Sequence, residues 1–532
     1  MALLRFMVLE SVFTYTGDFE KMRQNPDSMK AVIESTKQDI IKSESEAVSK
    51  ILTQIEFTVF YRFLNCYISH IDPHGFYFSE QSFSRFKESL SSSGQSFGFG
   101  LNEDVSGKVL ISAIVPGSSA WRSGNIHIGD EVVSVETGNK KALSSGLGLQ
   151  GILDFISEEV SETIILTLQK DQKQVSVTLS KEKIQNSENK VQGFILQGDH
   201  KAGYIYLPAF YTLWESDDYS GCAQDVAKTI YELKKENIQS LILDLRANGG
   251  GSIREAIELA GIFIDFGTMT VSENKTGELI SLKDMNRGTM YTGPLAILVN
   301  ESSASASEMV AAVLQDYNRA IVVGEKTFGK ASGQELIPLS SNENGEVIKV
   351  TTSQYYRVTG RSYQNNGVEP DILLPGITDP DGYKESDYTV KLENKSIDKK
   401  TYFTPLPPLP ISELRTKSNL RVANEKGFIK ITKLDSLLKQ FSEAYASLPA
   451  DLEGYKKYIE EQEIIAKEID QLFSEELNGF TTEDLAREKD LMRIYTYYEN
   501  MNNERKKRIR SDVYVHEAYE VLNDYLNLQN NK

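Results

Sequence analysis

The spacing of apolar residues changes along the chain and separates it into four segments. From Met29 to Phe63 apolar residues recur at helical intervals with few Gly or Pro, which is the pattern of amphipathic helices. This periodicity ends in the sequence HIDPHGFYF at 70–78. We therefore expect residues 1–93 to form a helical N-terminal region.

Residues 94–185 show a different, β-like pattern. Short apolar or alternating runs are separated by turn signals, which predicts a small β-rich module. The runs lie at 108–115, 131–136, 163–170 and 174–181.

Residues 190–378 alternate between strand-like and helix-like segments, which is typical of an α/β core. Within this segment Asn344 and Gly345 precede alternating apolar residues, a pattern that predicts a β-hairpin. The strand-like runs are 241–245, 295–299 and 320–324, and the helix-like segments are 221–237 and 307–317.

The last segment, 379–532, contains a proline-rich linker at 404–410 and is then rich in Glu, Lys and Leu at helical spacing. Its apolar residues from Leu434 to Tyr445 form one stripe, as on a helix that packs against a neighbour. We expect a helical C-terminal extension. The whole chain is thus predicted to be a multidomain α+β protein with an α/β core and a β-rich domain between helical terminal regions.

Composition and charge narrow the classes of partner that the chain is expected to bind. The chain has 532 residues and a formal net charge of −18, which argues against nucleic acid because phosphate binding needs a basic surface. The basic run at 504–510 lies in an acidic helical segment and is interpreted as a solvated helix face. No apolar run approaches the length of a membrane span. No metal-ligand spacing is present, so we expect neither a metal nor another cofactor.

Two features leave the cellular location open. Cys66 and Cys222 are far apart in sequence, and lone cysteines of this kind are usually small buried residues, although one disulfide is possible. The first residues are weakly apolar but carry Arg5 and Glu10 and lack a small-residue cleavage site, so we do not assign a signal peptide. Composition alone fits a cytoplasmic protein or an exported one without its leader.

Four serines lie close together in the sequence VNESSASASEMVAAV (299–313). Ser305 and Glu308 fit a capping box at the start of a helix, which is a purely structural role. A serine on a strand-to-helix turn can also act as a nucleophile, because the helix N-terminus supplies backbone N–H donors for an oxyanion. Serine then needs a base, and the core after His200 contains no histidine.

A lysine or a carboxylate is therefore the expected base. Lys330 lies among small residues in the loop GEKTFGKASGQ (324–334) after an apolar strand, and small neighbours allow its side chain to turn inward. A desolvated lysine can be neutral near pH 7. Lys326 is the competing candidate, but its neighbours Glu325 and Thr327 favour a solvated side chain.

A glycine-rich turn in the sequence DLRANGGGSIREA (244–256) follows a buried strand and precedes a helix. This arrangement resembles a phosphate cradle, but it matches neither common nucleotide-binding glycine pattern. Two interpretations remain open from these residues alone: an oxyanion site built from backbone N–H groups, or a tight turn.

Together these motifs resemble those of the carboxyl-terminal processing peptidases, in particular the tail-specific proteases of Gram-negative bacteria, which use a Ser/Lys dyad. The family pattern S-A-S-A-S-E matches 303–308, Q-D-x-x-R-A matches 315–320, and T-F-G-K-x-x-x-Q matches 327–334. Lys330 follows Ser305 by 25 positions, a spacing that the family keeps. The resemblance continues in the DLRxNxGG motif at 244–251 and in the segment 355–372.

The resemblance implies the roles of the site residues. Ser305 is expected to be the nucleophile, Lys330 the base, and Gln334 the residue that orients the lysine. Gly250 or Gly251, together with Ala306, would supply the oxyanion-hole N–H groups. The core would have a ClpP/crotonase-like fold. Asp316 and Arg319 are expected to be structural residues at the end of the helix.

Segments 71–86, 96–101 and 114–135 resemble the family's PDZ domain and the segment ahead of it, and the region around 396–403 resembles the C-terminal extension of the tail-specific branch. The resemblance implies that a substrate's C-terminal carboxylate binds a loop and that an apolar final residue is preferred. The binding residues would be Phe97, Gly98, Phe99, Gly100 and Leu101. Protein or peptide substrates with apolar C-termini are thus the expected partners, and an adaptor protein remains possible.

The sequence departs from the family pattern at Ala331 and Gly249, where Gly and Pro are common, and at Gly333, where Val is common. None of these changes removes a catalytic atom, so we expect an active enzyme. The resemblance implies export to the periplasm, with a leader that is not present in this chain. Two rival hypotheses are a non-catalytic PDZ scaffold with an inactive protease fold and a nucleotide-binding α/β protein, and the lack of a lysine after the glycines disfavours the second.

Overall fold

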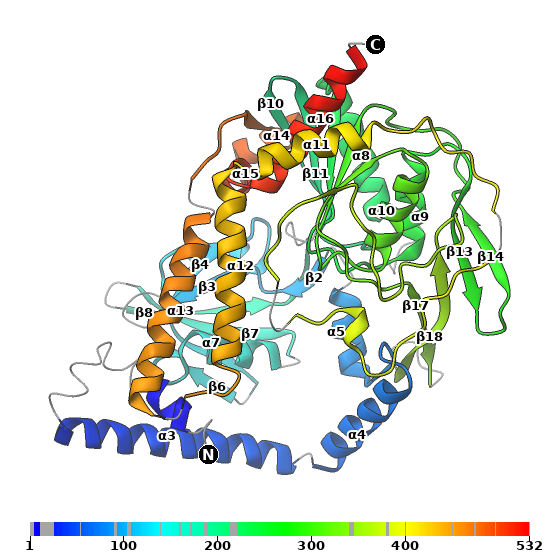
Figure 1. The fold of residues 1–532 in the computed structure, drawn as a ribbon. Helices are drawn as coiled ribbons and strands as arrows, with labels where there is room; N and C mark the ends of the chain where they lie inside the picture. The colour runs from blue at the N-terminus through cyan, green and yellow to red at the C-terminus, as the bar shows by residue number, and fades with distance from the viewer. Residues whose placement is uncertain are drawn as a thin grey trace.

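A computed structural model describes residues 5–10, 26–53, 55–89, 93–103, 108–138, 140–158, 161–170, 173–185, 190–212, 221–339, 345–378, 382–398, 401–449, 451–472, 475–494 and 496–530. Figure 1 shows the chain as a ribbon, with both terminal regions contributing helices around the sheets. In the part of the chain that the structure describes, no helix combines the length and the apolarity that a bilayer crossing requires.

The N-terminal region is mainly helical, as expected, but it also contributes a strand. Its elements are α3 (Pro26–Thr53), α4 (Ile55–Ile71), β1 (Phe76–Phe78) and α5 (Glu80–Ser89). Cys66 on α4 is exposed and only Cys222 is buried, so the expectation of two buried cysteines is wrong for Cys66, and both are free thiols.

The β-rich module is built around an antiparallel sheet with the strand order β3-β4-β5-β7-β8 and with β6 paired to β5. Apolar side chains such as Val132, Leu166 and Leu179 are fully buried beneath α7 and form its core. Strand β3 has a partner on one side only, so it lies at the edge of this sheet. The elements are β2 (Ser93–Ser96), β3 (Phe99–Glu103), β4 (Val109–Ile114), α6 (Ser119–Ser123), β5 (Glu131–Thr137), β6 (Lys140–Leu143), α7 (Ser144–Glu158), β7 (Thr163–Lys170), β8 (Lys173–Ser180) and β9 (Glu182–Gln185).

The α/β core holds a seven-stranded sheet with the order β19-β16-β15-β12-β11-β10-β20. Its central strands run parallel and are buried from end to end, which explains their continuous apolar runs. Because β12 and β15 are parallel neighbours, the loops that follow them meet at one edge of the sheet. The elements are β10 (Gln192–Gly198), β11 (Lys201–Tyr206), α8 (Cys222–Lys235), β12 (Ser240–Asp244), α9 (Ile253–Gly261), β15 (Leu295–Val299), α10 (Ala306–Asp316), β16 (Ile321–Gly324), β19 (Ile372–Leu373) and, from the C-terminal region, β20 (Phe480–Asp484).

A second sheet of the core contains β13 (Thr268–Asn274), β14 (Leu279–Lys283), β17 (Ser332–Pro338) and β18 (Val347–Tyr356). Strands β17 and β18 pair antiparallel, as the hairpin prediction required, although Asn344 of the predicted turn lies outside the described residues. Strand β1 of the N-terminal region also pairs with β18.

The C-terminal region is helical apart from β20. Helices α11 and α16 cover one face of the seven-stranded sheet, where Leu414, Tyr519 and Val521 join the same buried cluster as Leu298 and Val323 (Figure 1). No helix or strand forms within the proline-rich 404–410. The elements are a 3₁₀ turn η1 (Glu385–Asp387), α11 (Ile411–Val422), α12 (Lys426–Ala444), α13 (Leu452–Leu472), α14 (Ala486–Ile494), α15 (Thr496–Arg510) and α16 (Val513–Asn530).

Candidate active site

The glycine-rich turn after β12 and the serine loop after β15 are tied together by hydrogen bonds. The hydroxyl of Ser303 donates to the carbonyl of Leu245 at 2.8 Å, and that of Ser307 donates to the carbonyl of Asn248 at 2.8 Å. The N–H of Ala304 also donates to Asn248 O at 3.0 Å. Ser303 and Ser307 therefore have a structural role, because they hold the two loops in register.

Ser305 differs from its neighbours in its backbone. It lies just before α10 with φ +57° and ψ −111°, a region that non-glycine residues seldom occupy and that is typical of strained functional sites. Its N–H donates to Glu308 Oε2 at 2.8 Å, the glutamate half of the predicted capping box. The strained turn presents the side chain of Ser305 at the N-terminus of α10.

Gly250 lies directly against this turn. Its φ is +103°, and a Cβ at this position would come within 2.9 Å of both Ser305 Cβ and Ala304 O and within 3.2 Å of Ala306 N. Only glycine permits this approach without strain. The structure thus brings the expected oxyanion-hole residues beside the expected nucleophile.

The two candidate glycine donors differ in what their N–H groups bind. The N–H of Gly250 already donates to Asn248 Oδ1 at 2.9 Å. For Gly251, which has φ +140°, no hydrogen bond to a described residue engages the N–H. Of the two alternatives, Gly251 is therefore the donor that a ligand oxygen can use without displacing an internal contact.

Lys330 and Gln334 are joined by a hydrogen bond. The Lys330 amine donates to Gln334 Oε1 at 2.7 Å. Burial, and after it the nearby charge of Lys349, lowers the pKa of Lys330 from 10.5 to about 8. No hydrogen bond among the described residues joins this amine to the Ser305 hydroxyl, as is common in ligand-free sites. The rival Lys326 has a side chain that is 54% exposed, as expected for a solvated lysine.

Glu308 connects the serine and lysine loops, a role that its place in the predicted capping box did not reveal. Its side chain is fully buried, and its Oε2 accepts the backbone N–H groups of Ser305 and Lys330, both at 2.8 Å. Its Oε1 accepts from Thr327 Oγ1 at 2.6 Å and from Gly329 N at 2.7 Å. Burial raises the pKa of the Glu308 carboxyl to about 7, against the opposing effect of these donors.

The predicted peptide-binding loop lies at the edge of the β-rich module. Phe97 is buried in the core of the module, whereas Phe99 and Leu101 are only partly buried against it. Gly98 has φ +86°, and its N–H donates to Ser96 Oγ at 3.1 Å. Because β3 begins at Phe99 and forms the free edge of the sheet, this loop opens onto a strand that can accept a further strand.

Comparison with known proteins agrees with this architecture. Residues 201–374 match the model of peptidase family S41, and residues 87–145 match that of the PDZ domain. The chain carries an S41 peptidase domain and a PDZ domain. The S41 peptidase and PDZ domains that the resemblance implied, and the multidomain α+β class, are therefore confirmed.

Two curated relatives match more than half of this chain. The tail-specific protease of Haemophilus influenzae is 31% identical over 334 residues, which is 61% of this chain and 46% of that protein. A probable CtpA-like serine protease of Staphylococcus aureus strain RF122 is 29% identical over 308 residues, 57% of each chain. The chain thus spans about half the length of the curated relatives that it matches. Among solved structures, the photosystem II D1 C-terminal processing protease matches with 23% identity and a TM-score of 0.35, covering 60% of this chain and 83% of that one.

Within the S41 domain, the residues at the end of α10 have structural contacts. Asp316 forms an ion pair with Arg357, with Arg357 donating to its two carboxylate oxygens at 2.6 and 2.9 Å. Arg319 is buried and donates to the carbonyl of Tyr291 at 2.8 Å. Both fit the expected bracing of the helix, and Arg357 is a partner that the sequence did not reveal.

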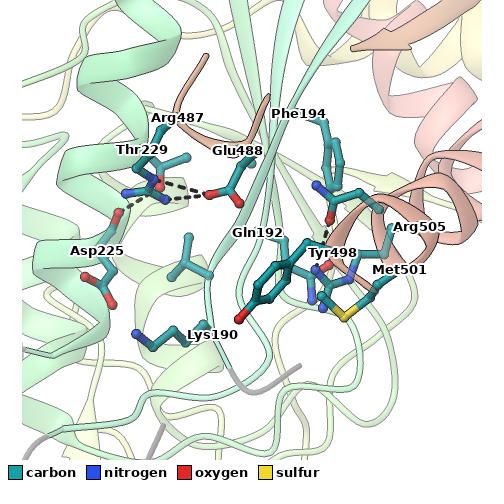
Figure 2. A pocket seen from close by; sticks show the side chains of 13 residues that line it. Lys190, Gln192, Phe194, Asp225, Thr229, Arg487, Glu488, Tyr498, Met501 and Arg505 are labelled. Atoms are coloured by element: carbon teal, nitrogen blue, oxygen red, sulfur yellow. Dashed lines mark hydrogen bonds and ion pairs between the residues drawn. The ribbon is translucent and has the colours of Figure 1, made fainter. Parts of the chain in front are cut away.

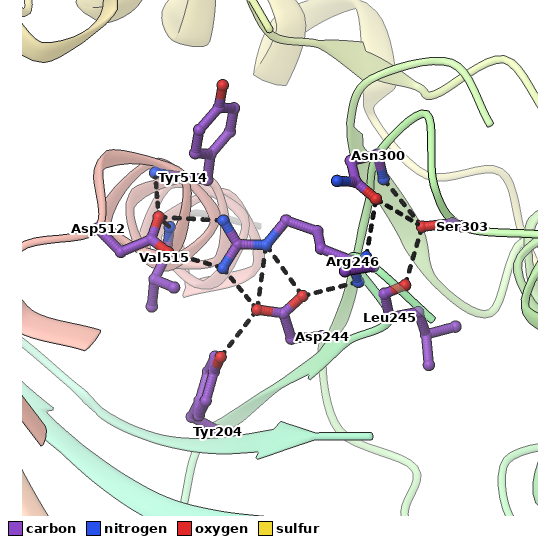
Figure 3. A network of polar contacts seen from close by, with 10 residues as sticks. Tyr204, Asp244, Leu245, Arg246, Asn300, Ser303, Asp512, Tyr514 and Val515 are labelled. Atoms are coloured by element: carbon purple, nitrogen blue, oxygen red, sulfur yellow. Dashed lines mark hydrogen bonds and ion pairs between the residues drawn. The ribbon is translucent and has the colours of Figure 1, made fainter. Parts of the chain in front are cut away.

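The C-terminal region contacts the glycine-rich turn at 244–251 through Arg246. Figure 3 shows its guanidinium between Asp244 and Asp512. It donates to Asp244 at 2.6 Å and to both carboxylate oxygens of Asp512 at 3.1 and 2.8 Å. The N–H of the next residue, Ala247, donates to Asn300 Oδ1 at 2.9 Å. Helix α16, which begins directly after Asp512, is thereby fixed to the turn that carries Gly250 and Gly251.

A separate cavity of about 260 Å³ lies where the S41 domain meets α14 and α15. Figure 2 shows side chains of both signs around it, including Lys190, Asp225 and Arg505. It contains none of the predicted site residues. Nearby, Lys506 of the basic run contacts Asp484 of β20 at 2.5 Å and is only 16% exposed, so the interpretation of that run as a solvated face is wrong for this lysine. The described residues contain no group of His, Cys, Asp and Glu that could hold a metal ion.

Proposed function

We propose that this chain is a serine endopeptidase that cleaves proteins recognised by their C-terminal tails, through an acyl-enzyme formed on Ser305. The proposal rests on one arrangement. Ser305, with its strained backbone, lies at the N-terminus of α10 against Gly250. One buried oxygen of Glu308 accepts both the N–H of Ser305 and the N–H of Lys330, whose side chain has a pKa of about 8. A purely structural turn needs no lysine with a lowered pKa.

In the first step Ser305 Oγ attacks the scissile carbonyl carbon and its proton passes to the neutral amine of Lys330. The carbonyl oxygen becomes an oxyanion, which the N–H groups of Gly251 and Ala306 stabilise. One such donor contributes about 3 kcal/mol to the transition state. Gln334 holds the lysine amine through its Oε1.

In the second step the tetrahedral intermediate collapses and the peptide C–N bond breaks. The leaving amine takes the proton from the Lys330 ammonium. Water then attacks the ester carbonyl, Lys330 accepts a proton from this water, and the same proton returns to Ser305 Oγ as the new carboxylic acid leaves. With a pKa of about 8, about one amine in ten is neutral at pH 7, so the base is available without a histidine.

The PDZ domain is proposed to capture the substrate's C-terminus as a strand added to β3. Its carboxylate would bind the amides of residues 97–101, and Phe99 and Leu101 would contact an apolar final side chain. The open edge of β3 and the partial exposure of these two side chains support this mode. The proposed domains span residues 1–93, 94–185, 190–378 and 379–532. Periplasmic location and an adaptor protein rest on the family resemblance alone, and cell fractionation tests the location.

The proposal is tested with an unfolded protein that ends in apolar residues. Ser305→Ala and Lys330→Ala should each abolish cleavage. Ser302→Ala and Lys326→Ala serve as matched controls, because both side chains are exposed and should leave cleavage intact. Binding of the tail without cleavage by the unmodified chain would favour the non-catalytic PDZ scaffold instead.

A further inference from the structure

The turn between α4 and β1 reaches β17, the strand that carries Gln334 and begins just after Lys330, and its neighbour β18, although this turn lies outside the segment that matches the S41 model. Strand β1 pairs with β18, and its Phe76 lies opposite Lys349. Strand β17, which carries Gln334, pairs with the same strand, and Gln334 lies opposite Thr351. The N-terminal region is thus part of the sheet that supports the candidate base.

A carboxylate in this turn holds Thr351 at two points. Asp72 Oδ2 accepts the backbone N–H of Thr351 at 2.7 Å, and Asp72 Oδ1 accepts its hydroxyl at 2.8 Å. The hydroxyl oxygen of Thr351 in turn accepts from Gln334 Nε2 at 3.1 Å, and Gln334 Oε1 accepts the amine of Lys330 at 2.7 Å. An unbroken chain of hydrogen bonds therefore runs from the N-terminal region to the lysine.

The donor and the acceptor of each hydrogen bond in this series follow from the bond between Asp72 and the Thr351 hydroxyl. An ionised carboxylate can only accept, so the single hydroxyl proton of Thr351 points to Asp72 and its oxygen is left to accept. The amide nitrogen of Gln334 must then face Thr351, where Ser332 Oγ also accepts it at 3.0 Å. The amide oxygen consequently faces Lys330.

We propose that Asp72 is a positioning residue for the lysine base, acting through Thr351 and Gln334. With the amide oxygen toward it, the neutral amine donates one N–H and keeps its lone pair for the proton of Ser305. With the amide reversed, Gln334 would donate to that lone pair and block the base. This inference rests on the proposed function of Lys330.

The turn at residues 72–74 also reaches Ala331, the residue after Lys330, by a second route. His74 Nε2 lies 2.9 Å from Glu385, a fully buried carboxylate that accepts from Gln364 Nε2 at 2.6 Å. Gln364 Oε1 accepts the N–H of Ala331 at 2.7 Å. The backbone after Lys330 and the partner of its amine are therefore both anchored to residues 72–74.

Substitutions in the full chain test the proposal. The single amide oxygen of Asp72→Asn cannot serve both positions: either Thr351 N–H loses its acceptor, or the NH₂ turns toward the Thr351 hydroxyl and the N–H of His74, and the hydroxyl then donates to Gln334 and reverses its amide. We expect kcat to fall by up to about 100-fold, as for small misplacements of a reacting group, with little change in KM. Thr351→Val should do the same, and Thr351→Ser, which keeps the hydroxyl, should restore activity. Asp451→Asn is the matched control, because the carboxylate of Asp451 accepts the N–H of Gly454 at 2.9 Å at the N-terminus of α13, in the C-terminal region.

The outcomes separate this inference from the proposed function. An inactive unmodified chain contradicts the proposed function itself. With an active chain, wild-type kcat in Asp72→Asn overturns the positioning role, and so does a loss that appears in KM alone. Circular dichroism reports whether Asp72→Asn is folded. If it is not, the Thr351 pair decides: an impaired Val variant beside an active Ser variant supports the relay, and equal activities overturn it.

Discussion

The backbone N–H groups of Ser305 and Lys330 donate to the same atom, Oε2 of Glu308, each at 2.8 Å. A single buried carboxylate oxygen thus sets the spacing of the two loops that carry the proposed nucleophile and base. Because Oε1 of the same group binds Thr327 and Gly329, all four donors need the carboxylate in its acceptor-only form.

Replacing Glu308 with Gln should therefore impair both activity and stability. The amide places an NH₂ group against two N–H or O–H donors, which leaves them without acceptors. We expect a loss of about 3 kcal/mol in the free energy of unfolding and a fall in kcat/KM of about 100-fold. Urea denaturation and peptide cleavage measure the two effects. The exposed Glu335→Gln is the control, and wild-type kcat/KM in Glu308→Gln would contradict the role.

The pH dependence of kcat/KM should reflect two groups. The pKa of Lys330 is lowered to about 8, so the neutral base accumulates as the pH rises toward that value. The pKa of Glu308 is raised to about 7, so below that pH the carboxyl gains a proton and loses an acceptor position. Activity should rise through both values and level off above about pH 8. In Glu308→Gln only the higher transition should remain, and a profile that falls between pH 6 and 8 would contradict both assignments.

Gly250→Ala should abolish most activity. A Cβ there meets Ser305 Cβ and Ala304 O at 2.9 Å, and the native φ of +103° is one that alanine rarely adopts. The displaced turn should lower kcat by about 100-fold, as when an oxyanion donor is lost. Gly249→Ala is a matched control one residue away, because a Cβ there meets no atom within 4 Å. Equal effects of the two substitutions would argue against close packing as the reason for the glycine.

Asp512→Asn should loosen the contact between α16 and the glycine-rich turn at 244–251. The substitution removes the charge that faces Arg246, a contact of 2.8 Å between side chains that are 19% and 17% exposed. The chain should lose about 2 kcal/mol of stability, as expected for a hydrogen bond to a charged group. Thermal unfolding measures this loss, with Asp490→Asn as a control because the Asp490 side chain is 74% exposed. Equal melting temperatures for the two variants would contradict the bracing role of Arg246.

Amidation of a substrate's C-terminus should weaken its binding, because the amide removes the charge that the PDZ loop at residues 97–101 is proposed to hold. Fluorescence anisotropy with labelled peptides measures the difference. A matched peptide with a free carboxylate and a charged last residue tests the apolar preference set by Phe99 and Leu101. Unchanged affinity after amidation would show that the C-terminal carboxylate does not contribute to binding.

Local sequence patterns predicted many of the helices and strands. The run at 295–299 is β15, the run at 163–170 is β7, and α10 begins directly after Ser305. These strands are predictable because a buried parallel strand such as β15 is a continuous apolar run, and a strand with one buried face such as β7 alternates over part of its length. The resemblance to known motifs then selected Ser305 and Lys330 from among similar residues, which periodicity could not do.

The contacts that support the site could not be predicted in the same way. Strands β1 and β20 are short, and their pairing with distant strands has no local signal. Asp72 meets Thr351 across 279 positions, and Arg246 meets Asp512 across 266. Such pairs depend on how separate regions pack, and a single sequence carries no record of that. Glu308 was recognisable as a helix cap, but its bonds to the lysine loop appear only in three dimensions.

The central claim is that Ser305 becomes acylated during cleavage. The most direct measurement is acid quenching of the chain during turnover of an unfolded protein with an apolar tail, followed by mass spectrometry of its peptides. The account predicts a substrate-derived acyl group on the peptide that contains Ser305 and no adduct in Ser305→Ala. Cleavage that continues in Ser305→Ala, or an acyl group on another residue, would contradict it.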